Sequence, residues 1–317
     1  MRLKTRRALA AGDRRGEEFY MSNSGSEAFE EIRVRVYDGM QIYGRHYPAP
    51  GSKRRPLVCL AGLTRNSRDF HDIAVALSGK DEAARPVYTI DTRGRGHSDF
   101  SKDWRQYAVP VEMLDVQDFM ASQHLHDAAV LGTSRGGLIA MVLAAVQPSL
   151  IGTVILNDIG PVIERDGLMR LAGFVGKHPP PLSWESAGQR IAGAEQALFP
   201  DIGAKEWLEI AKQRFNEANG KPAVGYDPEI GRSFSVLGDG PIPVLWKQFN
   251  ALNHAPCLVL RGELSDLLSE ATVTEMTERH PDCRAHTIAR QGHAPTLTDG
   301  PTQDVVRAFL KERDVGA

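Results

Sequence analysis

Cysteine is scarce in this chain of 317 residues, which contains Cys59, Cys257 and Cys283 and no C-x-x-C pair. An odd number of widely separated cysteines excludes a disulfide framework and argues against a zinc site. Two of them lie in the apolar runs VCL and PCLVL, where an unpaired thiol behaves as a small hydrophobic group. We therefore expect buried thiols and a reducing, cytoplasmic location.

Long apolar runs and an excess of basic charge are also missing. No stretch of about 18 apolar residues could span a bilayer. The formal net charge of −2 gives no electrostatic basis for binding nucleic acid or an anionic membrane. We expect the partner to be a small, fairly neutral molecule, and the oligomeric state stays open.

Motifs for nucleotides and metals are absent too. The chain has no H-E-x-x-H, no G-x-x-x-x-G-K, and no G-x-G-x-x-G that follows a strand and opens a helix. Neither a metal nor an organic cofactor is expected.

The amino-terminal residues are basic but lack the apolar stretch of roughly 7–15 residues that a secretory signal needs. We predict that residues 1–28 form a disordered or loosely ordered extension. One hypothesis is that translation starts at Met21, which intact-mass analysis would decide.

Apolar periodicity predicts an α/β fold with a doubly wound, mostly parallel sheet. From residue 29, apolar and polar residues alternate on either side of a D-G turn, which indicates an antiparallel hairpin. Short, continuous apolar runs indicate strands covered on both faces; they lie at 57–61, 87–90, 128–131, 153–157, 257–260 and 285–289. Between the predicted strands, apolar residues recur at helical spacing, which predicts helices at 69–79, 109–124, 135–147, 269–279 and 302–313.

The alternation of strand and helix is interrupted once. Residues 160–250 contain helical candidates and no convincing strand. We predict a core of residues 29–159 and 251–317 with a helical insertion, 160–250, between two strands of the sheet.

The sequence Gly132-Thr133-Ser134-Arg135-Gly136 lies directly between an apolar run and a helical stretch. A G-x-S-x-G pattern alone is weak evidence, but at a tight turn from strand to helix it exposes the serine hydroxyl above the sheet. The amino-terminal end of the helix adds N–H groups that favour developing negative charge. Ser134 is the candidate nucleophile.

A serine nucleophile needs a base and an acid that orients the base. His293 lies just past the run AHTIA, in a short loop before the carboxyl-terminal helix, and is the candidate base. Asp266 follows the run CLVL by a few residues and is the favoured acid. Two competitors are Glu263, expected to turn away, and Asp158, which follows TVILN and could reach the same histidine.

Ser134, His293 and Asp266 are accompanied by two further motifs. With them the chain resembles, over about residues 29–313, the esterase, lactonase and C–C hydrolase branch of the α/β-hydrolase fold family. The order Ser, Asp, His along the chain is the order expected for that fold. DTRGRGHSD (91–99) matches an Asp-x-Arg-Gly-x-Gly-x-Ser loop of the family. The resemblance implies a structural loop, with glycines at a tight turn and Asp91 and Arg93 holding it, so His97 is not proposed as a catalyst.

The second motif, LAGLTRNSRDF (60–70), resembles the segment that supplies one oxyanion donor, although Ala61-Gly62 stands where the family often has His-Gly. The resemblance implies that the N–H groups of Leu63 and Arg135 form the oxyanion hole. Thr64 either adds a side-chain donor or caps the following loop.

By the same resemblance, the insertion caps the active site. Its aromatic residues are expected to pack individually between cap and core and collectively to enclose an apolar pocket. They are Phe174, Trp184, Phe199, Trp207, Phe215, Trp246 and Phe249.

Three functions remain in competition. The first is hydrolysis of carboxylic esters of small to medium hydrophobic substrates through an acyl-enzyme, possible substrates including lactones and aliphatic polyesters. The second is hydrolysis of an enol-lactone or a C–C bond in aromatic degradation, where Arg65 and Arg135 could hold a substrate carboxylate. The third is a receptor-like protein that binds a ligand with slow turnover. Serine at the elbow argues against dehalogenase and epoxide-hydrolase chemistry, which requires a carboxylate nucleophile.

Overall fold

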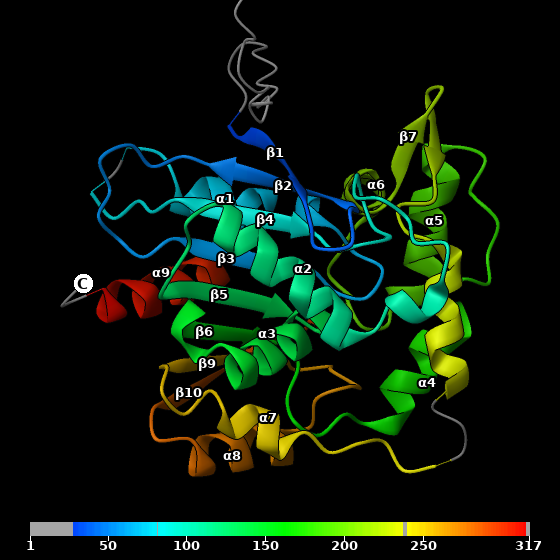
Figure 1. The fold of residues 1–317 in the computed structure, drawn as a ribbon. Helices are drawn as coiled ribbons and strands as arrows, with labels where there is room; N and C mark the ends of the chain where they lie inside the picture. The colour runs from blue at the N-terminus through cyan, green and yellow to red at the C-terminus, as the bar shows by residue number, and fades with distance from the viewer. Residues whose placement is uncertain (1–27, 81, 237–239, 315–317) are drawn as a thin grey trace, which may run out of the picture.

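An eight-stranded sheet forms the centre of the protein (Figure 1). The computed structural model describes residues 28–80, 82–236 and 240–314, so the predicted extension and Met21 lie almost wholly outside the described residues. The strands are β1 (Glu30–Arg35), β2 (Gln41–Tyr47), β3 (Leu57–Leu60), β4 (Val87–Asp91), β5 (Ala128–Thr133), β6 (Ile151–Asn157), β9 (Cys257–Gly262) and β10 (Cys283–Ile288). Their order across the sheet is β1-β2-β4-β3-β5-β6-β9-β10.

The predicted antiparallel hairpin and parallel sheet are both confirmed. β1 pairs antiparallel with β2 across a turn in which Gly39 has a φ of 89°, a conformation that favours glycine. β2 also pairs antiparallel with β4, and every pair from β4 to β10 is parallel. The short apolar runs were therefore correctly interpreted as strands of a parallel sheet.

Each predicted helix is present, with ends set by local chemistry. The helices are α1 (His71–Leu77), α2 (Val109–Ser122), α3 (Arg135–Val146), α8 (Glu270–Arg279) and α9 (Gly300–Arg313), with short 3-10 turns η1 (Ser67–Phe70), η2 (Trp104–Gln106) and η3 (Pro148–Leu150). Ser269 and Asp299 begin α8 and α9, because their side chains accept bonds from N–H groups of the first turn.

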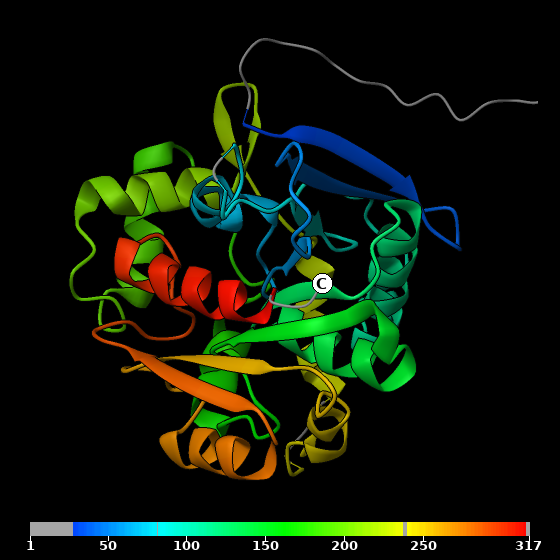
Figure 2. The ribbon, with the colours of Figure 1, turned by 90° about the vertical axis from the view of Figure 1, so that its left-hand side faces the viewer.

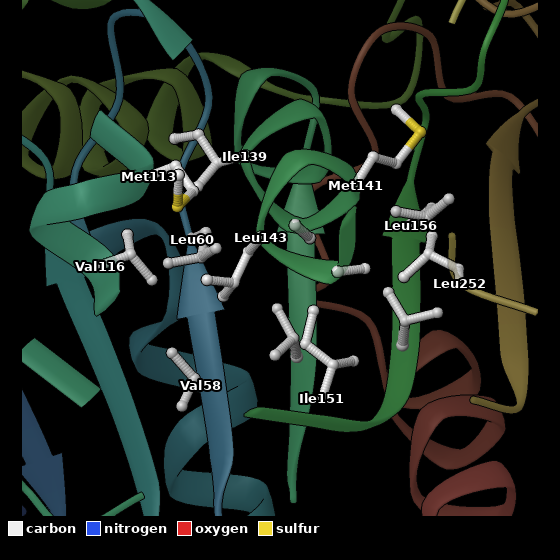
Figure 3. Close-up of a cluster of buried hydrophobic side chains, with 14 of the residues drawn as sticks. Val58, Leu60, Met113, Val116, Ile139, Met141, Leu143, Ile151, Leu156 and Leu252 are labelled. Carbon is white, nitrogen blue, oxygen red and sulfur yellow. The ribbon is translucent and has the colours of Figure 1, made fainter. Parts of the chain in front are cut away.

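Helices cover both faces of the sheet, which explains why its strands are apolar throughout. In β3, Val58 packs with α2 and α3 on one face, whereas Leu57 belongs to the cluster under α1 and α9 on the other. Figure 2 shows α9, in red, on the opposite side of the sheet from α2 and α3, in teal and green. Figure 3 shows part of the first cluster, in which Leu60 and Ile139 lie between strands and helices.

Most of the segment between β6 and β9 lies beyond the arrowhead end of β5, whereas its last helix lies near α8 (Figure 1). It contains α4 (Arg165–Phe174), α5 (Trp184–Glu195), α6 (Ala204–Arg214), β7 (Asn216–Ala218), β8 (Lys221–Ala223), η4 (Pro228–Val236) and α7 (Trp246–Asn250). The expectation that it holds no strand is wrong for the short hairpin β7-β8. Its turn is Asn219-Gly220, both with positive φ, and this pair is a strong hairpin signal that helical spacing around it obscured.

The aromatic residues of the insertion divide between two cores. Phe199 and Trp207 are buried in a separate cluster formed by α5, α6 and the loop between them. Phe249 and Trp246, on α7, pack instead with the main core beside α3. Phe174 remains 38% exposed. The insertion is therefore built around its own small core, while its last helix rests on the sheet domain.

Cys59 and Cys257 are buried and Cys283 is half-buried, and no disulfide joins them. Within the described ranges, no helix combines the length and the apolar character that crossing a bilayer requires.

Candidate active site

A strained turn joins β5 to α3 and carries Ser134. The serine has φ 51° and ψ −115°, a conformation that side chains rarely adopt. The two glycines of the motif permit it, because a Cβ on Gly136 would lie 2.0 Å from the carbonyl oxygen of Leu60 and one on Gly132 would lie 2.5 Å from the nitrogen of Gly137. Helix α3 therefore approaches strands β3 and β5 more closely than a side chain at position 132 or 136 would allow, as the motif predicts.

A continuous chain of hydrogen bonds links three side chains at this turn. Nε2 of His293 lies 2.9 Å from Oγ of Ser134, and Nδ1 of the same ring lies 2.7 Å from Oδ2 of Asp158. Asp158 is wholly buried and His293 is 9% exposed. The structure thus brings together the predicted serine and histidine although they are far apart in the sequence.

The predicted acid, Asp266, is not in this chain of bonds, and the prediction that it orients His293 is wrong. The carboxylate of Asp158 faces the imidazole and also accepts from the N–H of Gly262 at 2.8 Å and from Oγ of Ser265 at 2.5 Å. Asp158 follows β6 directly and has a φ of 55°, which turns its side chain toward the loop of the histidine. The alternative weighed against Asp266 is the one that the fold selects.

Asp266 is instead paired with Arg170 of α4, through bonds of 2.5 and 2.8 Å. Burial opposes ionisation of Asp266, but the Arg170 guanidinium outweighs it and holds the pKa of this carboxyl below its ordinary value. The loop after β9 carries Asp266 outward, where a cation from the insertion meets it. Glu263 accepts from the N–H of Arg290 and so turns away from the imidazole, as expected.

Asn157, which the sequence analysis did not single out, ties the serine turn to the histidine loop. Its carbonyl accepts from the N–H of Ser134 at 3.0 Å. Its side-chain nitrogen donates to Thr133 at 3.1 Å and to the carbonyl of Pro295 at 3.0 Å. A polar residue ending an otherwise apolar strand is the signal that could have found it.

The backbone N–H groups of Leu63 and Arg135 are the predicted oxyanion donors. In the described part of the chain, neither N–H donates to another backbone or side-chain atom. A Cβ placed on Gly62 would lie 3.7 Å from Cβ of Ser134, so the Leu63 segment passes beside the serine. The side chain of Asn66, rather than Thr64, caps the turn that follows, and the Thr64 donor stays a prediction.

A buried carboxylate connects the two candidate donor segments. Glu112 of α2 is wholly buried and pairs at 2.6 Å both with Arg95 and with Arg135. Arg95 also donates to the carbonyl of Leu63 at 2.7 Å. Burial opposes ionisation of Glu112, but Arg135 and Arg95 together hold its pKa below the ordinary value. This cluster fixes the segment around Leu63 relative to α3.

The loop 91–99 has the structural role that its resemblance implied. Asp91 accepts from the N–H groups of Ser67 and His97, at 2.6 and 2.8 Å. A Cβ on Gly96 would lie 1.9 Å from the Asp91 carboxylate, so glycine is required there. Arg93 pairs with Asp115 inside the core.

The insertion contacts the loops around the triad. A Cβ on Gly292, next to His293, would lie 2.6 Å from Cβ of Leu198 in the insertion. Arg68 of η1 donates to the carbonyls of Gln213 and Phe215. These contacts place part of the insertion against the histidine loop and against the segment that follows Leu63.

Such an arrangement can perform acyl transfer. The imidazole can remove the serine proton, the buried carboxylate can hold the imidazole tautomer and stabilise its protonated form, and two unoccupied N–H groups can bind an oxyanion. Among the described residues, no cluster of three or more histidine, cysteine, aspartate or glutamate side chains is arranged to hold a metal ion.

The sequence is similar to those of known hydrolases. Residues 55–193 match the family model of the alpha/beta hydrolase fold. A 3-hydroxybutyrate-oligomer hydrolase of Cupriavidus necator is 33% identical over 276 residues, which are 82% of this chain and 90% of the relative. The chain belongs to the α/β-hydrolase fold family.

Further similar proteins agree with the assignment of this chain to the α/β-hydrolase fold family. A crystal structure of an α/β hydrolase from Novosphingobium aromaticivorans is 35% identical, with a TM-score of 0.83 over 91% of this chain and all of that one. An sn-1-specific diacylglycerol lipase of Xenopus tropicalis is 31% identical over 86% of this chain and 79% of the relative. The protein is a member of the esterase type, a carboxylic-ester hydrolase.

Proposed function

We propose that Ser134 is the nucleophile, that His293 is its general base, and that Asp158 orients the histidine. The observation that carries the proposal is the unbroken chain from Oγ of Ser134 to Nε2 of His293 and from Nδ1 to the buried carboxylate of Asp158. Ser134 attacks the ester carbonyl while His293 takes its proton and then gives it to the leaving alkoxide. Water, activated by the same histidine, hydrolyses the acyl-enzyme.

The N–H groups of Leu63 and Arg135 bind the oxyanion that forms in each tetrahedral intermediate. Their lack of an acceptor in the described structure and the close passage of the Gly62 segment beside Ser134 support this role. Each donor is expected to stabilise the transition state by about 3–4 kcal/mol. The Glu112 cluster holds the Leu63 segment in place for that task.

The substrates are esters of small to medium hydrophobic acids, with oligoesters of hydroxy acids as a specific candidate. The oligoester candidate is supported by the 3-hydroxybutyrate-oligomer hydrolase, which is similar to this chain over most of both lengths. The insertion acts as a cap over the site; its contacts with the histidine loop and with η1 support this placement.

A fluorophosphonate probe and one variant test the proposal. The probe should label Ser134, and Ser134→Ala should abolish both labelling and hydrolysis of p-nitrophenyl acetate and butyrate. A wild-type protein that is folded but neither labelled nor active on these esters would contradict it. The same outcome would be expected of the ligand-binding alternative, which the enzymatic relatives do not favour.

Hydrolysis of an enol-lactone or a C–C bond is less well supported than hydrolysis of a simple carboxylic ester. Of the two arginines considered for holding a substrate carboxylate, Arg135 is bound to Glu112 and to the carbonyl of Tyr107. Faster turnover of dienelactone than of p-nitrophenyl butyrate would favour this alternative over the ester hydrolase.

A further inference from the structure

Arg65 lies beside the candidate nucleophile, on the segment that carries the Leu63 donor. Its N–H bonds to the carbonyl of Gly62 at 3.1 Å, which closes a turn. A Cβ placed on Gly62 would lie 3.4 Å from Cγ of Arg65 and 3.7 Å from Cβ of Ser134. Cγ of Arg65 and Cβ of Ser134 therefore both lie close to Gly62.

The guanidinium of Arg65 forms an ion pair with Asp69 through Nε, whereas its terminal nitrogens are not bonded to the described protein. Its Nε lies 2.6 Å from Oδ2 of Asp69 but is not aligned for a hydrogen bond, and Oδ1 of Asp69 also has no partner in the described structure. The two terminal nitrogens donate to no described atom, and the side chain is 23% exposed. Burial, followed by the nearby Arg214, lowers the pKa of Arg65, and the carboxylates of Asp69 and Glu195 oppose this shift.

Three other arginines around the site each donate to the protein through at least one terminal nitrogen. Each makes two hydrogen bonds to protein acceptors: Arg170 to Asp266, Arg214 to Glu195, and Arg135 to Glu112 and the carbonyl of Tyr107. Arg65 differs from these three arginines because, among the described residues, neither of its terminal nitrogens donates to a protein acceptor.

We propose that Arg65 binds a carboxylate of the substrate, and that the preferred substrates are esters whose alcohol part carries a free carboxylate a few bonds from the scissile oxygen. The inference rests on the proposed function and narrows its substrate class. An oligoester of a 3-hydroxy acid, cleaved at its carboxyl-terminal unit, has this chemistry, because the leaving alcohol is itself a hydroxy acid. A planar guanidinium can bind such a carboxylate through two parallel N–H donors.

A matched pair of substrates tests the proposal: the linear dimer of 3-hydroxybutyrate as the free acid, and its methyl ester, which lacks the charge. The wild-type kcat/KM should be higher for the acid. Arg65→Met should lower kcat/KM for the acid by about 10- to 100-fold, the range for a lost charge-assisted hydrogen bond, and for the methyl ester by less than about threefold. Arg65→Lys should recover part of the loss.

Arg284→Met is the matched control, because Arg284 forms a single exposed ion pair with Glu312 at the start of β10. It should leave both rates unchanged. Equal losses for acid and methyl ester in Arg65→Met, or a wild type that does not distinguish them, would overturn the proposal and assign Arg65 to holding the loop.

Asp69→Asn gives a second, independent measurement if Arg65→Met does not fold. It removes the carboxylate that competes for Arg65, so 3-hydroxybutyrate should inhibit hydrolysis of p-nitrophenyl butyrate more strongly, with a Ki at least threefold lower. An unchanged or higher Ki counts against the proposal. A failure of the proposed function itself would look different, since none of the three esters would then be hydrolysed and Ser134 would not be labelled.

Discussion

Replacing Asp158 by asparagine tests the central assignment of the active site. Oδ2 of Asp158 accepts from Nδ1 of His293 at 2.7 Å. An asparagine can keep its carbonyl toward the N–H of Gly262 and can donate to Oγ of Ser265, so the local structure should survive. Asparagine also tolerates the positive φ of 55° at this position.

The amide would nevertheless present a donor to the imidazole. Nδ1 of His293 would then have to accept, and Nε2 would carry the proton, so the ring could no longer take the proton of Ser134. We expect kcat for p-nitrophenyl butyrate at pH 7 to fall by about 10³- to 10⁴-fold, with a melting temperature close to that of the wild type.

Asp266→Asn is the decisive comparison. The ion pair of Asp266 with Arg170 has side chains 26% and 25% exposed, and a pair of this kind contributes up to about 1 kcal/mol to stability. This variant should keep kcat/KM within about fivefold of the wild type. A loss of three orders of magnitude in Asp266→Asn, together with an active Asp158→Asn, would refute the assignment.

Three further outcomes follow from buried charge and close packing. Glu112→Gln leaves the buried Arg95 and the partly exposed Arg135 short of a counter-charge and should lower the free energy of unfolding in urea at pH 7 by about 3–5 kcal/mol, whereas Glu312→Gln, which breaks an exposed pair, should change it by less than about 1 kcal/mol. Because the folded-state pKa of Glu112 lies below its unfolded value, its ionisation stabilises the fold above about pH 4 and the contribution disappears as the pH falls through the folded pKa. The stability difference between wild type and Glu112→Gln should therefore shrink between pH 5 and pH 3, and a constant difference would show that charge is not the cause. Gly136→Ala places a methyl group 2.0 Å from the Leu60 carbonyl and should prevent stable folding, whereas Gly193→Ala, on an open face of α5, should stabilise the protein by about 0.5–1 kcal/mol; calorimetry of both variants checks the contrast.

Local patterns in the sequence were sufficient for the sheet domain. Strands covered on both faces must be apolar at every position, so runs such as those of β3 and β5 differ clearly from the helices between them. The serine turn was predictable for a similar reason, because Gly132 and Gly136 are required by contacts with residues that are near in the sequence or in the adjoining strand. His293 could be found because it lies in the loop that joins the last strand to the carboxyl-terminal helix.

The acid could not be chosen from local patterns. Asp158 and Asp266 both follow strands whose carboxyl ends meet at the same edge of the sheet, so spacing along the chain makes them equivalent. What separates them is the direction that each loop takes, and the presence of Arg170, on a helix of the insertion, to neutralise Asp266. Contacts between distant segments determine both.

The serine, the histidine and the parallel sheet were thus encoded in periodicity and short motifs, which depend on neighbours along the chain. The partners of Asp158, Arg135 and Asp266 were decided by the tertiary structure alone, because each of these pairs joins segments that are distant in the sequence. Asp158 reached the imidazole, Arg135 was bound to Glu112, and Asp266 was bound to Arg170 for this reason.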